Sequence, residues 1–150
     1  MKFKVKKFKN LSVAELYDLL RLRSEIFVLE QKCIYLDTDG YDQDSLHILG
    51  YSKKKLVAYA RIVPPGTIFK TVSIGRVVVD EKFRDKKIGH LLMERSIKET
   101  VKKYKPEIIS ISAQTHLQKF YNRLGFKSIG KTYLDCDIPH VKMLLKNPSP

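Results

Sequence analysis

The chain has 150 residues, and 43% of them are hydrophobic, which is enough for one sizeable core but not for two ordinary domains. Phe and Tyr make up 10% of the residues, and this aromatic content excludes a largely disordered chain. The 29 Lys and Arg residues exceed the 16 Asp and Glu residues, and the net charge of +13 favours a polyanionic partner such as nucleic acid, anionic lipid or a phosphorylated cofactor. We predict one domain over residues 1–146 and a flexible tail at 147–150.

The two cysteines, Cys33 and Cys136, stand far apart without a Cys-x-x-Cys pair, and a chain of this size does not need a disulfide scaffold. The lysine-rich N-terminus lacks the apolar stretch of a signal peptide, and no apolar run approaches the ~18 residues of a membrane span. We therefore expect a reducing, cytoplasmic environment and no membrane association. No spacing of His and Cys resembles a metal site, so we expect no metal.

Hydrophobic periodicity and turn residues predict ten elements along the chain. They are, in order, a strand at 2–9, a helix at 12–31 with a break near Arg23, strands at 46–51, 56–63 and 72–80, a helix at 86–104, a strand at 108–113, a helix at 115–124, and strands at 126–131 and 141–145.

Local capping signals mark the helix ends. Ser12 with Glu15 and Thr115 with Gln118 have the spacing of capping boxes, which predicts that each pair opens a helix. Gly125 follows the last apolar position of its helix and is expected to be a left-handed C-cap.

One strand, turn and helix predict a phosphate site. The run Val77 to Val79 indicates a strand buried on both faces, and a basic turn at 84–89 leads from it into the next helix. The unpaired N–H groups and the dipole of a helix N-terminus attract phosphate, and Gly89 would let the backbone approach a bulky anion. The alternative is a solvated turn with a tightly packed glycine. The segment is neither a P-loop nor a Gly-x-Gly-x-x-Gly motif.

Two motifs in order resemble those of the GNAT superfamily of N-acetyltransferases. Residues 84–89 are similar to its Arg/Gln-x-x-Gly-x-Gly/Ala pyrophosphate loop, and residues 120–126 are similar to its Phe-Tyr-x-x-x-Gly-Phe segment. Segments at 20–31, 35–37, 39–40, 74–79, 113–118 and 138–140 resemble the ElaA-like branch more narrowly. The resemblance implies an α/β (α+β) fold, in which about four helices flank a mixed central sheet of about six to seven strands.

The resemblance also implies a function, which is transfer of the acetyl group of acetyl-CoA to a primary amine by direct attack in a ternary complex. It assigns Tyr121 as the general acid that protonates the departing thiolate. The cofactor-binding residues that it implies are Val77, Val78, Val79, Arg84, Asp85, Lys86, Lys87, Ile88, Gly89, His90 and Phe120. The alternative for Tyr121 is a core aromatic, because it shares an apolar helix face with Leu117, Phe120 and Leu124.

The pyrophosphate loop departs from the family's pattern at two positions. Lys87 replaces the first glycine, and Asp85 stands where a second glycine is frequent. If the backbone at these positions needs a positive φ, a side chain there is strained, and cofactor affinity is the property most affected.

The sequence leaves the general base open. An attacking amine must lose a proton, and His116, His140 and Glu30 are the candidates for the base or the acceptor site, with an ordered water as a further option. Each of the three has an ordinary packed or solvated role as its alternative.

Four aspartates gather between residues 37 and 44 without the register of an EF-hand. Asp37, Asp39, Asp42 and Asp44 form either a turn-rich loop or an acceptor pocket whose carboxylates attract a cationic amine.

Two other functions stay open beside the enzyme. The charge of +13 is typical of a basic nucleic-acid-binding module, although the aromatics fall on apolar faces and no recognition motif is present, so we expect no specific nucleic acid. The altered loop is compatible with a CoA-binding regulatory protein without catalysis. The expected partners are acetyl-CoA and a small-molecule or peptide amine, and pairing into a homodimer is left open.

Overall fold

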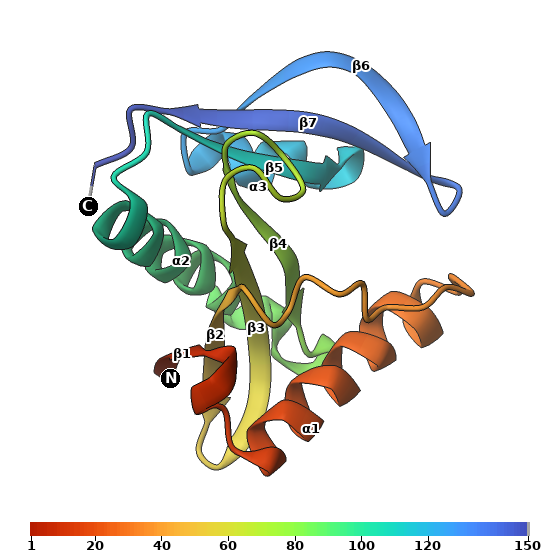
Figure 1. Cartoon of the computed structure of the whole chain (residues 1–150). Helices are drawn as coiled ribbons and strands as arrows, with labels where there is room; N and C mark the ends of the chain where they lie inside the picture. Colours follow the sequence, from red (N-terminus) through yellow and green to blue (C-terminus); the bar gives the residue numbers. More distant parts are fainter. Residues whose placement is uncertain (150) are drawn as a thin grey trace.

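A seven-stranded mixed sheet in the order β1-β2-β3-β4-β5-β7-β6 forms the centre of the protein (Figure 1). The computed structural model describes residues 1–149. The strands are β1 (Lys2–Lys7), β2 (Leu46–Ser52), β3 (Lys55–Val63), β4 (Val72–Val79), β5 (Ile108–Gln114), β6 (Lys127–Asp135) and β7 (Ile138–Lys146). Neighbouring strands are antiparallel except β4 and β5, which are parallel.

The helices follow the predicted order along the chain. They are α1 (Val13–Arg23), a π-helix η2 (Ser24–Glu30), α2 (Ile88–Tyr104) and α3 (Gln118–Arg123), with short 3-10 turns η1 (Phe8–Asn10), η3 (Glu81–Lys86) and η4 (Thr115–Leu117). The predicted element order and fold class are therefore confirmed.

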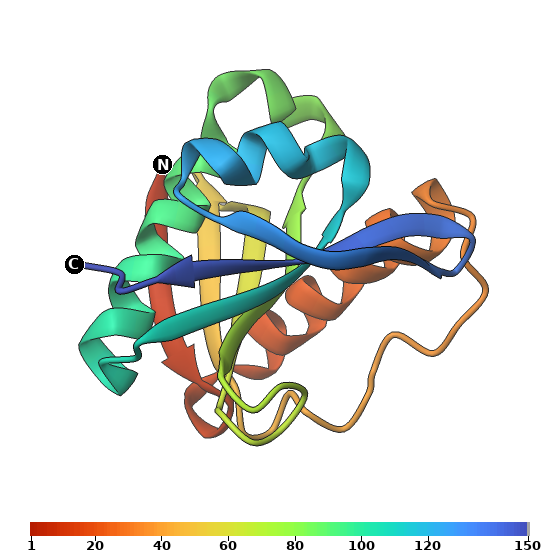
Figure 2. The same cartoon turned by 90° about the horizontal axis from the view of Figure 1, so that it is seen from above.

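The two long helices cover opposite faces of the sheet, as Figures 1 and 2 show from two sides. Leu92 and Met93 of α2 pack with Ile48 and Ile62 in the larger core. Residues of α1 and η2 pack with β2, β3 and β4 in the smaller core, whose buried members are Leu19, Leu22, Ile26, Leu49, Leu56, Tyr59 and Val78. Burial of these apolar side chains from water holds both helices to the sheet.

The first helix begins and changes where the sequence predicts. Ser12 accepts a hydrogen bond from the Glu15 amide and the Glu15 side chain accepts one from the Ser12 amide, which completes the capping box. The expected break near Arg23 is the point at which the α-helix continues as a π-helix. The second predicted capping box is wrong, because Thr115 lies inside a 3-10 turn and no side chain caps that turn or α3.

A hairpin of β6 and β7 reaches across to the end of the first helical segment. Cys136 at its tip and Cys33 just beyond η2 form a disulfide, with Cα atoms 5.9 Å apart and a sequence separation of 103. The sequence did not indicate this disulfide, because the fold brings together positions that are distant in the sequence. The cytoplasmic location stays a prediction.

The end of the chain is described up to residue 149. The Asn147 amide donates a hydrogen bond to the Glu107 carbonyl at 2.7 Å, and Pro150 of the predicted tail lies outside the described residues. No helix within residues 1–149 is both long and apolar enough to span a membrane.

Candidate functional site

The site lies where β4 and β5 separate. The two parallel strands pair only at their first residues, Val72 with Ile109 and Ser73 with Ser110, and then diverge (Figure 1). The backbone groups on this edge of β4 beyond Ser73 therefore have no strand partner in the part of the chain that the structure describes. Two hollows open into the gap and meet there.

The first hollow, which we call the β4 groove, has a volume of about 400 Å³. It runs between the open edge of β4, the start of α2 and the helix α3. Six of the predicted cofactor-binding residues line it, namely Val77, Val78, Val79, Arg84, Gly89 and Phe120. Val78 is buried, but Val77 and Val79 are only half-buried because they face this groove, which corrects the prediction of a strand buried on both faces.

The N-terminus of α2 opens beside the groove without a side-chain cap. The first amides of a helix have no carbonyl four residues earlier to bind, so they remain available to an anion. A Cβ at Gly89 would lie 3.5 Å from Phe120 Cζ, so glycine leaves free the space that a side chain would occupy between α2 and α3.

The remaining predicted loop residues flank this opening without lining the groove. Asp85 and Lys86 end the turn η3, and Lys87 precedes α2 with φ 56° and ψ 19°. The concern about a positive φ therefore applies to Lys87 and not to Asp85. Ile88 is buried in the larger core, and the exposed His90 ring pairs with Glu94 at 2.8 Å.

Arg84 and Glu30 form an ion pair across the groove. Arg84 Nη2 lies 2.8 Å from Glu30 Oε1, and Arg84 Nε donates to the Val79 carbonyl at 3.1 Å. This pair ties the turn before α2 to the end of η2. It also gives the Glu30 carboxylate a partner of the same chain, which disfavours Glu30 as a general base.

The second hollow, which we call the central cavity, has a volume of about 650 Å³. Its walls come from the end of η2 and the loop after it, from β3, β4 and β5, and from the hairpin of β6 and β7. Cys33 and Cys136 both line it, so the disulfide joins two of its walls. It shares five lining residues with the β4 groove, which are Gln31, Val77, Gln114, Leu117 and Tyr121.

Tyr121 stands at this junction with its side chain largely enclosed, at 7% relative exposure. Its ring packs edge-on against Phe120 and Phe126 at centroid distances of 5.0 and 6.1 Å. Burial raises the pKa of Tyr121 to about 12, so the phenol keeps its proton at neutral pH. The side chain is thus both a core aromatic, as the alternative interpretation held, and a wall of both hollows.

The two candidate histidines lie on different sides of the junction. His116 lines the β4 groove, whereas His140 of β7 lines the central cavity. His140 Nδ1 lies 2.7 Å from the Ile138 carbonyl, and its ring stacks on Tyr133 at 5.9 Å. A carbonyl oxygen can only accept a hydrogen bond, so Nδ1 carries the proton and Nε2 of the neutral ring is left with a lone pair.

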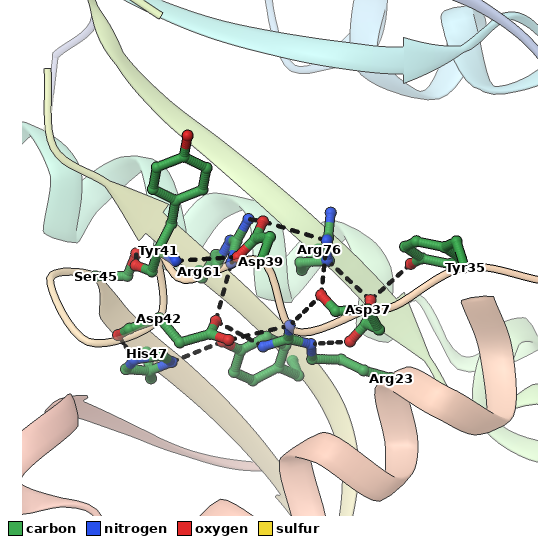
Figure 3. A network of polar contacts seen from close by, with 11 residues as sticks. Arg23, Tyr35, Asp37, Asp39, Tyr41, Asp42, Ser45, His47, Arg61 and Arg76 are labelled. Carbon is green, nitrogen blue, oxygen red and sulfur yellow. Dashed lines mark hydrogen bonds and ion pairs between the residues drawn. The ribbon is translucent and has the colours of Figure 1, made fainter. Parts of the chain in front are cut away.

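A buried network of three arginines and three aspartates supports the central cavity (Figure 3). We call it the ion cluster, and its members are Arg23, Asp37, Asp39, Asp42, Arg61 and Arg76. Arg23 is fully buried and donates from Nε to Asp37 and from Nη1 to Asp42, each at 2.7 Å. Arg61 donates to Asp42 at 2.9 Å and also binds Asp39. Three positive and three negative charges thus balance inside one network.

These contacts fix the ionisation of the acids and of a neighbouring histidine. Burial acts to raise the pKa of Asp39, but hydrogen bonds from Arg61 and Tyr41 outweigh it and lower this pKa to about 2. Arg23 and Arg61 likewise outweigh burial at Asp42 and lower its pKa. Burial lowers the pKa of His47, whose Nε2 donates to the Asp42 carbonyl at 2.9 Å.

The ion cluster decides between the two interpretations of the acidic loop. Asp39 accepts a hydrogen bond from the Tyr41 amide at 3.1 Å, which is a turn-forming role. The hypothesis of carboxylates that attract a cationic amine is wrong for Asp37, Asp39 and Asp42, because arginines of the same chain already neutralise them.

Sequence reasoning missed the arginines of the ion cluster and the two glutamines at the junction. One signal was present, since Arg61 and Arg76 each stand alone inside an apolar strand segment. A charge at a buried strand position requires a partner, and the loop at 37–44 is the main acidic segment of the chain. Gln31 and Gln114 carry no such signal.

Comparison with known proteins identifies the family. The family model described as "Acetyltransferase (GNAT) domain" matches residues 26–147. Protein ElaA of Escherichia coli (strain K12) is 42% identical over 136 residues, which cover 89% of this chain and 89% of ElaA. The crystal structure of Escherichia coli ElaA covers 97% of this chain and 99% of that chain with a TM-score of 0.91 and 39% identity.

Two further solved structures share the fold. An acyl-CoA N-acyltransferase from Pseudomonas aeruginosa has a TM-score of 0.89 and 39% identity, and the match covers 96% of this chain and 99% of that chain. An aminoglycoside 6'-N-acetyltransferase complexed with coenzyme A has a TM-score of 0.74 at 17% identity, over 98% of this chain and 99% of that chain, which shows the fold alone. The family match and the identity to ElaA together establish that this chain belongs to the GNAT acetyltransferase family and is a homologue of ElaA.

Proposed function

We propose that this chain is an N-acetyltransferase that moves the acetyl group of acetyl-CoA to a primary amine by direct attack in a ternary complex. The observation that carries the proposal is the junction of the β4 groove and the central cavity at Tyr121. Two separate hollows that meet at one buried phenol suit a donor and an acceptor that react without a covalent enzyme intermediate. Family membership supports the choice of an acyl-CoA donor.

The groove offers an acyl-CoA two kinds of backbone contact. The unpaired edge of β4 can hydrogen-bond the amides of a pantetheine arm as an added strand does. The uncapped N-terminus of α2 can hold a diphosphate, and the absent side chain at Gly89 leaves room for it. An N–H of β4 would then polarise the thioester carbonyl as a fixed oxyanion donor.

Tyr121 is the group best placed to protonate the leaving sulfur. The amine nitrogen attacks the thioester carbon, the carbon–sulfur bond breaks, and the phenolic proton passes to the thiolate. The raised pKa keeps Tyr121 protonated at neutral pH, which is the form that an acid role requires.

His140 is the proposed base. It lines the central cavity from β7, opposite Gln114 of β5, and its Nε2 lone pair is free to accept the proton of the attacking amine. His116 lies on the groove side, and Glu30 is bound to Arg84.

The role of Tyr121 is tested with the variant Tyr121→Phe in an assay of thiol release from acetyl-CoA across an amine panel. We expect kcat to fall by about 10²-fold to 10⁴-fold, which is the usual contribution of a general acid, while acetyl-CoA binding measured by calorimetry persists. The matched control Tyr17→Phe changes an exposed tyrosine of α1 and should leave kcat unchanged.

Three outcomes are distinguishable in that assay. An unchanged kcat in Tyr121→Phe removes the acid role alone. If the wild type binds acetyl-CoA but releases no thiol above background with any amine, the protein binds the cosubstrate without catalysis. Absence of both binding and release contradicts the proposal as a whole.

The role of His140 is tested by comparing kcat/KM of the wild type with that of two histidine variants. We expect His140→Gln to lower kcat/KM by about 10²-fold, because the variant loses the imidazole that accepts the proton of the attacking amine. His116→Gln serves as the control, and if it causes that loss while His140→Gln does not, the base is on the groove side.

A further inference from the structure

The central cavity has few negative charges. Its lining includes two guanidinium groups, Arg61 and Arg76, and one carboxylate, Asp135. The aspartates of the ion cluster bind arginines and do not line it. An amine with several ammonium groups would therefore find one carboxylate in this lining, beside guanidinium groups that cannot accept a hydrogen bond from it, which disfavours its binding.

Contacts with the acidic loop hold the Arg76 side chain in place, but they do not occupy all of its hydrogen-bond donors. Its Nη2 donates to the Asp37 carbonyl at 2.9 Å and to Asp39 Oδ2 at 3.3 Å, and its Nε lies 3.0 Å from Asp37 Oδ1 without hydrogen-bond alignment. The rings of Phe27 and Tyr35 lie 5.8 and 5.9 Å from its guanidinium carbon. The other terminal nitrogen, Nη1, makes no hydrogen bond among the residues described, and Figure 3 shows one nitrogen of Arg76 pointing away from the two aspartates.

An irregularity in the backbone of β4 directs the Arg76 side chain to the cavity. Arg76 has φ 50° in the middle of β4, opposite the register shift between Tyr59 and Arg61 in β3. A bulge of this kind redirects a side chain out of the regular alternation of a strand. The contacts with Asp37, Phe27 and Tyr35 then fix the guanidinium before any ligand arrives, so a ligand loses little entropy in ordering it.

We infer that the acceptor amine also carries a carboxylate, which Nη1 of Arg76 binds while the amine faces Tyr121. A planar guanidinium with a free N–H donor forms strong charge-assisted hydrogen bonds with carboxylates. This inference rests on the proposed function and narrows its substrate class to amino acids and related amino carboxylates.

The test compares ω-amino acids, from glycine to 6-aminohexanoic acid, with the matching primary amides as acceptors. Each pair has the same amine and the same chain length and differs only in the charge at the far end. For the best chain length we expect kcat/KM for the acid to exceed that for the amide by about 10-fold to 100-fold, as one charge-assisted hydrogen bond provides.

Variants connect this preference to Arg76. Arg76→Gln should bring the ratio of acid to amide close to one, and Arg76→Lys should keep part of the preference because it keeps the charge. Arg95→Gln removes an arginine of α2 that pairs with Glu99 and does not line the cavity, so the ratio should not change. Acetyl-CoA binding by calorimetry shows whether each variant is folded.

The outcomes separate this inference from the proposed function. If the wild type acetylates amides as readily as acids, the carboxylate site is wrong while the N-acetyltransferase stands. If it acetylates neither, the proposed function fails, and calorimetry with the acids and amides in the presence of CoA decides the carboxylate site. Tighter binding of the acids, lost in Arg76→Gln, supports the site, and equal binding overturns it.

Discussion

Lys87 adopts a backbone conformation that glycine reaches without strain. Its φ of 56° and ψ of 19° lie in the left-handed region, where a Cβ crowds the neighbouring carbonyl. The position directly precedes the first amides of α2. The lysine there carries backbone strain that a glycine would not.

Replacing this residue should stabilise the protein. For Lys87→Gly we expect the free energy of unfolding to rise by about 1 kcal/mol, because glycine removes the steric strain of the left-handed region. Urea denaturation measures the change. The neighbouring Lys86 does not have a positive φ, so Lys86→Gly is the matched control and should lower stability. If Lys87→Gly instead lowers the free energy of unfolding, the lysine side chain stabilises the fold by more than its backbone strain destabilises it.

Arg76 and Arg61 show how single charged residues inside strands define a site. Each is the charged member of an otherwise apolar strand segment, and each turns toward the acidic loop and the central cavity. The buried position selects arginine, because its guanidinium can bind several acceptors in one plane.

The first helical segment and the acidic loop form one unit through Arg23. This arginine lies at the change from α1 to η2, where the helix widens, and it contacts Asp37 and Asp42 of the loop. Phe27 and Gln31, one and two turns further along, line the central cavity. The ion cluster thus fixes the loop and the helix against β3 and sets the shape of that cavity.

Removal of Arg23 should be costly for stability. For Arg23→Leu we expect the free energy of unfolding to fall by about 3–5 kcal/mol, since the buried carboxylates of Asp37 and Asp42 would each lose a guanidinium partner. Arg21→Leu, two residues earlier, removes an exposed arginine that pairs with Glu25, and it should lower stability far less. Equal effects of the two substitutions in urea denaturation would contradict a structural role for the ion cluster.

The edge strand β6 has no buried residue. Its pairing with β7, which is paired in turn with β5, and the link between Cys33 and Cys136 hold β6 over the cavity. A covalent link between two cavity walls limits how far they can separate.

Charge is distributed unevenly over the molecule. The ion cluster contributes three positive and three negative charges, so the whole excess of +13 lies outside it. Lys86 and Lys87 expose part of this excess beside the start of α2. A positive surface next to a proposed diphosphate site accelerates the approach of an anionic cosubstrate.

Acid should destabilise the protein through the same cluster. The pKa of Asp39 is about 2 in the folded chain, below its ordinary value of 3.8. A lowered pKa stabilises the fold above the unfolded-state pKa, and this contribution is lost as the pH falls from about 4 to about 2. We expect the melting temperature to drop across that window by calorimetry. Asp39→Asn should weaken the drop, whereas Asp44→Asn, at an exposed position of the same loop, should leave it intact.

Many local features of the fold follow from patterns of residues that lie close together in the sequence. The capping box of Ser12 and Glu15, the change near Arg23, and the left-handed Gly125 at the end of α3 all match their predictions. These features depend on contacts between residues a few positions apart, where spacing in the chain fixes spacing in space. The proposed diphosphate turn and Tyr121 were predicted from the resemblance of two short segments to GNAT motifs, and their roles stay predictions.

The central cavity, the ion cluster and the disulfide arise from contacts that no local pattern encodes. Arg23 reaches Asp37 over 14 residues, Arg61 reaches Asp39 over 22, and Cys33 reaches Cys136 over 103. Their proximity depends on strand order, on the bulge in β4 and on the divergence of β4 from β5. Such geometry is set by how whole elements pack. The sequence therefore shows which charged and cysteine residues need a partner, whereas the packing of the sheet determines which residues become those partners.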